Sequence, residues 1–190
     1  MIDKESYYTL DTVHNGRIIN DNFDIKYLLV LLNSQLLRFV YENSVNETGK
    51  VFAQVKIIYV DPLPIKNIPL AEQQPFIELA DKMLSLNADL QKSTQRFIKR
   101  VKENLNPAKI SSALESFYTM EFPDFVKELA KQKVKLSLKQ QDEWEEYFAE
   151  YKENCVLLQE QINTTDAEIN QLVYKLYDLT EEEISAVEGK

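Results

Sequence analysis

The longest apolar pattern in the chain runs from Ser137 to Leu176 and predicts one long helix. Apolar residues recur there at spacings of three and four, and neither glycine nor proline interrupts them. The segment opens with Ser137-Leu-Lys-Gln140, a capping box in which the serine and glutamine side chains satisfy backbone N–H groups reciprocally. At 1.5 Å per residue, a helix of about 40 residues is roughly 60 Å long. Such a helix needs a second element to cover its apolar stripe.

A second heptad pattern predicts the partner helix. Pro75 stands where the first turn of a helix tolerates a missing N–H, and apolar heptad positions then continue from Phe76 to Val101. We therefore expect a pair of long helices with limbs at 75–105 and 138–177.

The two stripes also predict how the limbs align. Antiparallel pairing places Phe97 opposite Ile162, and it places the polar gap at Thr94 opposite the polar gap at Thr165. Polar residues that share one layer are typical of a position that sets the register of a coiled coil. We predict an antiparallel helical coiled coil on this register.

The sequence between and after the limbs predicts shorter helices. Residues 110–117 and 123–132 have the spacing of two short helices, so that 107–136 forms a helical cap at the tip of the pair. Thr180-Glu-Glu-Glu183 is a second capping box, which starts a short final helix. Residues 71–190 are thus predicted as one antiparallel helical stalk.

The first 70 residues open with the pattern of a β-hairpin. Residues 7–13 alternate and are rich in Tyr, Thr and Val, as half-buried strands are. Asn15-Gly16 favours a tight turn, and residues 17–19 would form the returning strand.

A helix and a second strand region follow the hairpin. The helix is expected over 25–43, with apolar residues on more than one face, as if buried against a sheet. Residues 51–60 alternate like a strand, and Pro62 and Pro64 end the pairing because neither can donate to a ladder. A sheet this short is expected to continue into sequence that precedes Met1. The predicted fold class is α+β, mostly helical: a small partial α/β unit in residues 1–70, then a long antiparallel helical coiled coil with a helical tip.

Charge is distributed unevenly along the chain. The sequence carries 22 Lys and Arg against 31 Asp and Glu, a net charge of −9. Residues 92–109 hold six basic residues against Glu103, and 127–139 hold five lysines against Glu128, whereas 140–190 hold three lysines and fourteen acidic residues. Because the acidity is concentrated in the C-terminal part, the net charge does not exclude an anionic partner for the N-terminal half.

Candidate catalytic groups are few. Cys155, the one cysteine, lies on the apolar stripe and is expected to be buried; it excludes a disulfide framework and favours a reducing compartment. His14 is the only histidine, and the three glycines are scattered, so the sequence favours neither a histidine metal site nor a phosphate loop. Without an apolar leader or a membrane-spanning run, we expect a cytoplasmic protein that does not contact a membrane. Catalysis by this chain alone is not expected.

Polar side chains around the predicted hairpin and second strand suit nucleic-acid binding. Asn and Gln can read adenine bidentately, and Arg and Lys can read guanine or hold phosphates. The basic runs further along are weaker evidence, because ion pairs between the limbs, such as Lys99 with Glu160, explain part of them. The candidate DNA-binding residues are Asn15, Arg17, Lys50, Gln54, Lys56 and Lys66.

Seven motifs along the chain form a combination typical of one family. They are Tyr27-Leu-Leu-Val-Leu-Leu-Asn-Ser-Gln-Leu-Leu37, Thr48-Gly-Lys50, Gln54-Val-Lys56, Pro62-Leu-Pro-Ile65, Phe76-Ile-Glu-Leu-Ala-Asp-Lys-Met-Leu84, Ile169-Asn-Gln-Leu-Val-Tyr-Lys-Leu-Tyr-Asp-Leu-Thr-Glu-Glu-Glu-Ile184 and Val187-Glu188. Together they resemble the TaqI-like C-terminal specificity domain of type II, and especially type IIG, restriction–modification enzymes. The resemblance covers nearly the whole chain, less clearly 107–136, and Asp178 stands where the family usually has glycine.

The resemblance implies the target-recognition domain of an adenine-specific N6 DNA methyltransferase, often fused to an endonuclease. Such a domain binds double-stranded DNA opposite the parent's own N-terminal catalytic domain and registers the target adenine for flipping. The Asn-Pro-Pro-Tyr-type catalytic motif and the S-adenosylmethionine loop are absent from this sequence. We therefore expect that this chain neither methylates nor cleaves, and that it holds no cofactor or metal. S-adenosylmethionine, and Mg²⁺ for a nuclease, would belong to the parent enzyme.

Two alternatives stay open at the level of sequence. A fragment of a type I restriction specificity subunit would also join recognition domains to paired helices. A coiled-coil module that binds a protein partner through its stalk would need no DNA readout. A homodimer through the helices is compatible with each of these readings.

Overall fold

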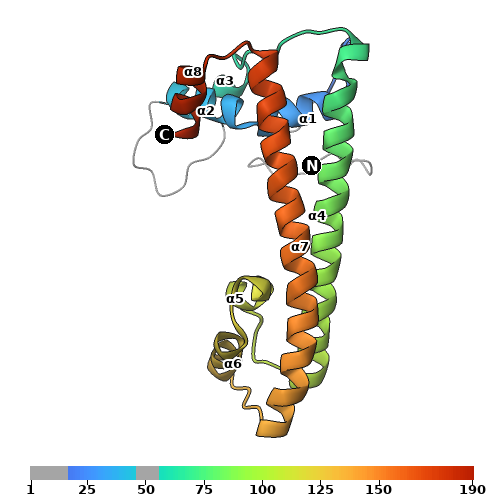
Figure 1. The fold of residues 1–190 in the computed structure, drawn as a ribbon, viewed down its shortest axis with the longest axis vertical. Coiled ribbons are helices and arrows are strands. Elements are labelled where there is room, and N and C mark those ends of the chain that lie inside the picture. Colours follow the sequence, from blue (N-terminus) through green and yellow to red (C-terminus); the bar gives the residue numbers. More distant parts are fainter. Residues whose placement is uncertain (1–16, 46–55) are drawn as a thin grey trace. The chain divides into compact units, whose positions relative to one another are not determined.

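The described part of the chain is mostly helical. The computed structural model describes residues 17–45 and 56–190, and within these ranges it contains helices and no strand. The chain divides into two compact units, a terminal unit of Met1–Lys82 and Thr165–Lys190 and a central unit of Met83–Thr164. Figure 1 labels the helices α1 (Ile25–Asn33), α2 (Gln35–Ser44), α3 (Ile57–Val60), α4 (Leu70–Leu105), α5 (Ser112–Glu115), the 3₁₀ turn η1 (Phe117–Thr119), α6 (Phe122–Lys131), α7 (Leu138–Leu176) and α8 (Glu181–Glu188), of which α4 and α7 contribute to both units.

The strands predicted for the first 70 residues are wrong wherever the structure describes that region. Residues 17–20 have no regular secondary structure, and residues 57–60 form α3. The N–H of Asp61 donates to the carbonyl of Ile57 at 2.9 Å, a local bond that replaces the cross-strand ladder a strand would need. A short apolar run does not distinguish a strand from a helical turn by its period, and here the chain forms local i→i+4 bonds. The other parts of that prediction, residues 7–13, Asn15-Gly16 and 51–55, lie outside the described residues.

The helix predicted over 25–43 is present but is broken at Ser34. Ser34 has an extended backbone, with ψ of 152°, and is fully buried between α1 and α2. Its hydroxyl donates to the carbonyl of Leu31 at 2.7 Å and accepts from the N–H of Leu37 at 3.3 Å. One serine therefore ends α1 and caps α2, as its short hydroxyl side chain allows.

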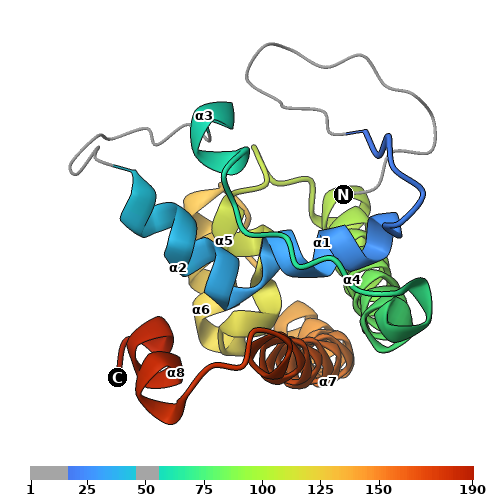
Figure 2. The same cartoon turned by 90° about the horizontal axis from the view of Figure 1, so that it is seen from above.

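Side chains from α1, α2, the start of α4 and the end of α7 form the core of the terminal unit. The ring of Tyr27 meets the ring of Phe76 edge-on, with centroids 5.2 Å apart. Helix α8 lies beside α2, as Figure 2 shows. The buried apolar residues of this unit are Tyr27, Val30, Leu31, Leu36, Leu37, Phe76, Ala80, Ile169, Val173, Tyr174 and Val187.

The central unit is built around Phe97. This ring is fully buried and stacks on Phe117 of η1 with centroids 3.8 Å apart, and it also contacts Phe125 of α6 at 5.6 Å. The 3₁₀ turn η1 and helix α6 thus pack through aromatic side chains onto α4 and α7, and α5 adds the buried Leu114 to the same cluster. The short helices expected at 110–117 and 123–132 are confirmed in outline, as α5 with η1 and as α6.

In the central unit α4 and α7 run antiparallel, but the predicted register is wrong. Phe97 lies 5.6 Å from Tyr151, and the hydroxyl of Ser93 lies 3.0 Å from the amide of Asn154. The predicted partner of Phe97 was Ile162, roughly eleven residues or three helical turns further along α7. Thr94 satisfies its hydroxyl within its own helix, by donating to the carbonyl of Leu90 at 2.8 Å.

The predicted helix ends are mostly confirmed. The N–H of Gln140 bonds to the Ser137 hydroxyl at 3.4 Å and the N–H of Ser137 to the Gln140 side chain at 3.0 Å, so the capping box is present. The second box, at Thr180 and Glu183, is also present. Helix α4 begins at Leu70, so Pro75 lies in the second turn and not the first. Among the described helices, none is both long enough and apolar enough to cross a membrane.

Candidate nucleic-acid interface

The candidate DNA-binding residues that the structure describes all belong to the terminal unit. Arg17 is exposed at the start of the first described range, whereas Lys56 and Lys66 are half-buried. The remaining three candidates, Asn15, Lys50 and Gln54, lie outside the described residues.

Tyr41 holds both flanks of the segment that contains two of these candidates. Its backbone carbonyl accepts from the N–H of Val45 at 3.2 Å, and its hydroxyl accepts from the N–H of Lys56 at 3.1 Å. Its ring also meets the ring of Tyr59 edge-on, with centroids 6.3 Å apart. Val45 and Lys56, the described residues nearest to the undescribed segment, therefore both bond to Tyr41, the first through the backbone bond that ends α2 and the second through the tyrosine side chain.

Lys66 caps the end of α7. Its ammonium group donates to the carbonyl of Leu176, the last residue of the helix, and lies 3.1 Å from the carboxylate of Asp178. It also lies over the ring of Tyr177, 5.9 Å from the centroid. A cation at a helix C-terminus satisfies an orphan carbonyl and complements the helix dipole. These intramolecular contacts compete with the role in DNA binding that the sequence suggested.

Two tyrosines fix the backbone next to Lys66. The hydroxyl of Tyr27 donates to the carbonyl of Lys66 at 2.7 Å. The hydroxyl of Tyr177 donates to the carbonyl of Pro64 and accepts from the N–H of Lys66 at 3.2 Å. Burial, and then the neighbouring Tyr177, raise the pKa of Tyr27 to about 12, so the phenol stays a donor at any physiological pH.

Gln73 joins three separate stretches of the terminal unit. Its side chain is fully buried; the amide oxygen accepts from the N–H of Asp24 at 2.9 Å. The amide nitrogen donates to the carbonyls of Asn22 at 2.7 Å and Ile68 at 2.9 Å. The start of α4 is thereby fastened to the residues that precede α1.

Gln35 makes the equivalent connection between α2 and the C-terminal helices. Its backbone N–H donates to Asn170 of α7 at 2.9 Å, and its side-chain oxygen accepts from the hydroxyl of Tyr174 at 3.1 Å. Its amide nitrogen donates to the carbonyl of Val187 in α8 at 3.4 Å. An open groove of about 830 Å³ lies here between α2, α7 and α8, lined mainly by polar side chains.

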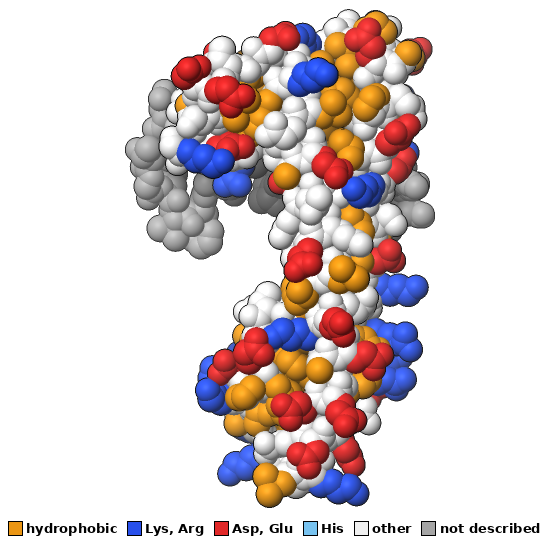
Figure 3. Space-filling model, in the orientation of Figure 1, with side chains coloured by type: hydrophobic (Ala, Val, Ile, Leu, Met, Phe, Trp, Pro, Cys, Tyr) orange, Lys and Arg blue, Asp and Glu red, His pale blue; other side chains and the backbone are white. Residues whose placement is uncertain are grey.

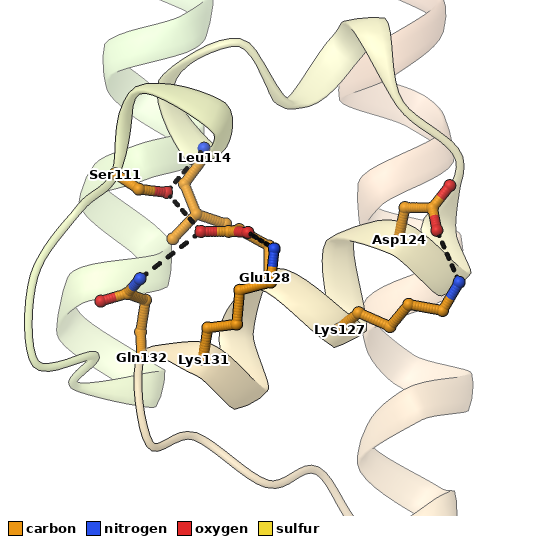
Figure 4. Close-up of polar contacts among 7 residues, drawn as sticks. All are labelled: Ser111, Leu114, Asp124, Lys127, Glu128, Lys131 and Gln132. Carbon is orange, nitrogen blue, oxygen red and sulfur yellow. Dashed lines mark hydrogen bonds and ion pairs between the residues drawn. The ribbon is translucent and has the colours of Figure 1, made fainter.

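Glu128 is the most enclosed carboxylate of the central unit, and Figure 4 shows its partners. The hydroxyl of Ser111 donates to it at 2.8 Å, and the ammonium group of Lys131 lies 2.8 Å from its other oxygen. Gln132 donates a weaker bond at 3.4 Å. Lys131 first, and then Ser111, hold the pKa of Glu128 below its ordinary value. Since Ser111 also caps α5, this carboxylate joins α5 to α6 and is engaged in structure.

Within the helices of the central unit, short-range ion pairs occupy part of the two basic runs. Lys99 and Arg100 share Glu103, at 3.7 and 3.3 Å, and Lys127 pairs with Asp124 at 2.7 Å. The ion pair predicted between Lys99 and Glu160 depended on the register that the structure corrects. Exposed pairs of this kind contribute little to stability.

Sequence reasoning missed the polar residues that hold the terminal unit together. Gln73 stands three residues before the buried Phe76, on the same face of α4, and this spacing was the available signal. Among the described residues, no buried side-chain nitrogen or oxygen lacks a hydrogen-bond partner. Nor do three His, Cys, Asp or Glu side chains of the described ranges converge as metal ligands would. In the described part of the terminal unit, the buried polar side chains are therefore all hydrogen-bonded and serve the fold.

Comparison with known families gives two matches that follow one another along the chain. Residues 1–65 match the TaqI-like C-terminal specificity domain, which confirms the resemblance for this part and identifies a specificity fragment of a restriction–modification system. Residues 69–173 match a family described as a domain of unknown function, DUF8810. Because this second match spans more than half of the 190 residues, the chain belongs to the DUF8810 family, with a TaqI-like specificity domain at its start. Neither the curated proteins nor the solved structures gave a match.

Proposed function

We propose that this chain is the C-terminal DNA sequence-recognition fragment of a type II restriction–modification enzyme. The match of residues 1–65 to a specificity domain supports DNA recognition as the role. The observation that carries the proposal is the bond from the N–H of Lys56 to the hydroxyl of Tyr41, which brings residue 56 back to the end of α2, where Val45 bonds to the carbonyl of the same residue. Lys50 and Gln54 lie in this segment, and a base-reading side chain needs a fixed origin because base contacts depend on register with the duplex.

In this proposal the parent protein is a site-specific adenine N6 DNA methyltransferase, which in some enzymes of this type is fused to an endonuclease. The fragment binds double-stranded DNA, and the parent's N-terminal catalytic domain supplies the chemistry and S-adenosylmethionine, with Mg²⁺ where it cleaves. The described residues do not fit these groups: their one glycine, Gly189, ends α8, and their carboxylates form no metal cluster. The chain alone should transfer no methyl group to DNA in a radiolabel assay, and measurable transfer would contradict this division of labour.

The proposal is tested by selecting duplexes from a randomised library with the intact chain. We expect enrichment of one short sequence, because direct readout discriminates by roughly 1–3 kcal/mol for each good base contact. The double variant Gln54→Ala/Lys56→Ala should lose the enrichment while keeping the wild-type circular dichroism spectrum and melting temperature.

A matched control replaces the same residue types elsewhere in the terminal unit. Gln74→Ala/Lys175→Ala changes one exposed glutamine and one lysine of the long helices, and it should enrich the wild-type sequence. If the Gln54 and Lys56 variant also retains the enrichment, these residues do not read the DNA. If the wild-type chain enriches nothing, the recognition proposal is wrong, and a protein-interaction module becomes the better reading.

A type I specificity-subunit fragment is the second candidate, because α4 and α7, of 36 and 39 residues, follow the specificity domain as paired helices would. The same selection separates the two candidates. A type I fragment that dimerises through its helices would enrich two half-sites at a fixed spacing, and it would sediment as a dimer. One continuous sequence bound by a monomer supports the type II reading.

A further inference from the structure

One face of α4 in the central unit is rich in hydrogen-bond donors. Between residues 87 and 102 this helix carries five basic side chains, all exposed, and Asp89 is the one acidic residue in that stretch. Lys92, Arg96 and Lys99 follow one another at spacings of four and three, so they share one face of the helix. The exposed amides of Gln91 and Gln95 lie on the adjoining row.

The structure itself uses few of these charges. Lys99 and Arg100 share Glu103, but within the described ranges Lys92, Arg96 and Lys102 form no ion pair. In Figure 3 one group of basic side chains of this unit lies on its α4 side and others lie over α5 and α6, whereas acidic side chains follow α7. Of these two helices, α4 therefore presents positive and α7 negative charge to solvent, and an anionic partner would be attracted to α4 rather than to α7.

The surface beside this row is hollowed. An open groove of about 750 Å³ runs between α4 and the segment of α5 and η1. Its walls include the amides of Gln91 and Gln95, the cations of Lys99 and Lys102, and the side chain of Tyr118. Glu115 is the one carboxylate of this lining. Lysine, arginine, amide and tyrosine side chains are the usual donors to phosphate oxygens.

We propose that this face of α4 binds the sugar–phosphate backbone of double-stranded DNA without reading its sequence. The proposal rests on the DNA-binding function proposed above and adds a second contact, in the DUF8810 part of the chain, to that of the specificity domain. Residues four apart along a helix are about 6 Å apart in rise, so Lys92, Arg96 and Lys99 form a ladder of cations beside this groove. Lys92 and Arg96 also line a neighbouring groove on the α7 side, which includes the carboxylates of Asp89 and Glu150. The expected contribution is affinity and orientation, because phosphate contacts position a protein and carry no sequence information.

The test measures how duplex binding depends on salt. The intact chain is titrated into a fluorescein-labelled duplex of unselected sequence at several salt concentrations between about 50 and 200 mM, with anisotropy as the readout. The variant Lys92→Gln/Arg96→Gln/Lys102→Gln removes the three cations without an ion pair. Each lost phosphate contact lowers the slope of log K against log salt by about 0.9, so the slope should fall by roughly 2 to 3. At the lowest salt, affinity should fall at least tenfold.

A control variant removes the same charge elsewhere in the central unit. Lys109→Gln/Lys135→Gln/Lys139→Gln changes three exposed lysines outside this face of α4, and it should keep the wild-type slope. If both variants lost salt slope and affinity equally, the effect would come from net charge in general, and the proposal would be overturned. An unchanged slope in the α4 variant would also overturn it. Binding of an acidic protein by this face would likewise leave the duplex slope unchanged.

The measurement is independent of sequence readout. A chain that enriches no sequence from the library, yet loses duplex binding in the α4 variant, refutes the recognition proposal and supports this one. Conversely, the wild-type chain could select one sequence, and the α4 variant could keep the same preference, affinity and salt slope. That result would support the recognition proposal and refute the proposal for α4.

Discussion

At the scale of single residues, the terminal unit depends on buried polar side chains as much as on apolar ones. Gln73 uses its amide oxygen and both amide protons on three backbone groups, at Asn22, Asp24 and Ile68. No apolar side chain of the same volume could satisfy those groups, which would be left without partners in the interior. The adjacent Gln74 is exposed, and its side chain donates to Glu78, one turn along α4.

This contrast predicts different outcomes for the same substitution at neighbouring positions. Gln73→Leu should lower the free energy of unfolding by about 2–4 kcal/mol, because buried backbone groups lose their partners. Gln74→Leu should change it by less than about 0.5 kcal/mol. Urea unfolding followed by circular dichroism measures both values, and similar losses in the two variants would contradict the role assigned to Gln73.

Glu128 predicts a dependence of stability on pH. Because Lys131 and Ser111 lower the pKa of this carboxyl in the folded chain, folding favours its charged form. The stabilisation is therefore present above the unfolded pKa of about 4.3, and it is lost as the pH falls through the lower folded value. Glu128→Gln should melt at a lower temperature than wild type at pH 7, and the difference should narrow in acid.

Glu115→Gln provides the matched control for this measurement, since Glu115 is an exposed carboxylate in the same unit. The melting temperatures of wild type and both variants are measured between pH 7 and pH 3, and the difference from wild type should depend on pH for Glu128→Gln but not for Glu115→Gln. A difference between wild type and Glu128→Gln that stays constant down to pH 3 would show that the carboxylate charge is irrelevant to stability.

At the scale of elements, the sequence predicted the long helices and their direction but not their alignment. A shift of roughly eleven residues is close to three whole turns, so it keeps the same face of α7 towards α4 and preserves the apolar pattern. The prediction placed Thr94 opposite Thr165 so that the two polar side chains would share one layer. Thr94 does not need a polar partner on the other helix, because its hydroxyl bonds to the carbonyl of Leu90 in its own helix. The aromatic cluster around Phe97 involves α6 and η1, whose contacts are long-range and are not encoded in helical period.

The register is open to a direct test with the native cysteine. The sulfur of Cys155 lies 3.5 Å from the hydroxyl oxygen of Ser93, so Ser93→Cys should form a disulfide with Cys155 on mild oxidation. Asn104→Cys is the control, because the sequence-derived register would place residue 104 opposite Cys155. Titration of free thiols should show loss of both in the Ser93 variant and of neither in the Asn104 variant. The reverse pattern would restore the sequence-derived register.

At the scale of the whole molecule, the order of helices and the caps of α7 and α8 followed from local rules that act within one turn of helix. The role of Lys66 did not, because it is set by residues distant in sequence, such as Leu176. The break at Ser34 rests on local bonds to Leu31 and Leu37, inside an apolar pattern that continues across it. The family matches meet between residues 65 and 69, yet the terminal unit includes the start of α4 and the end of α7. The specificity segment thus completes its core with helices from the other family.

The arrangement at Tyr41 has a consequence for how specificity can change over evolution. Val45 and Lys56 both hydrogen-bond to Tyr41, so the positions of residues 45 and 56 depend on contacts outside residues 46–55. Loop-closure entropy grows only with the logarithm of length, by about 0.6 kcal/mol for each doubling. A change in the length of residues 46–55 is therefore expected to cost the described scaffold little free energy, and under the proposed function such changes would alter recognition while the scaffold stays the same.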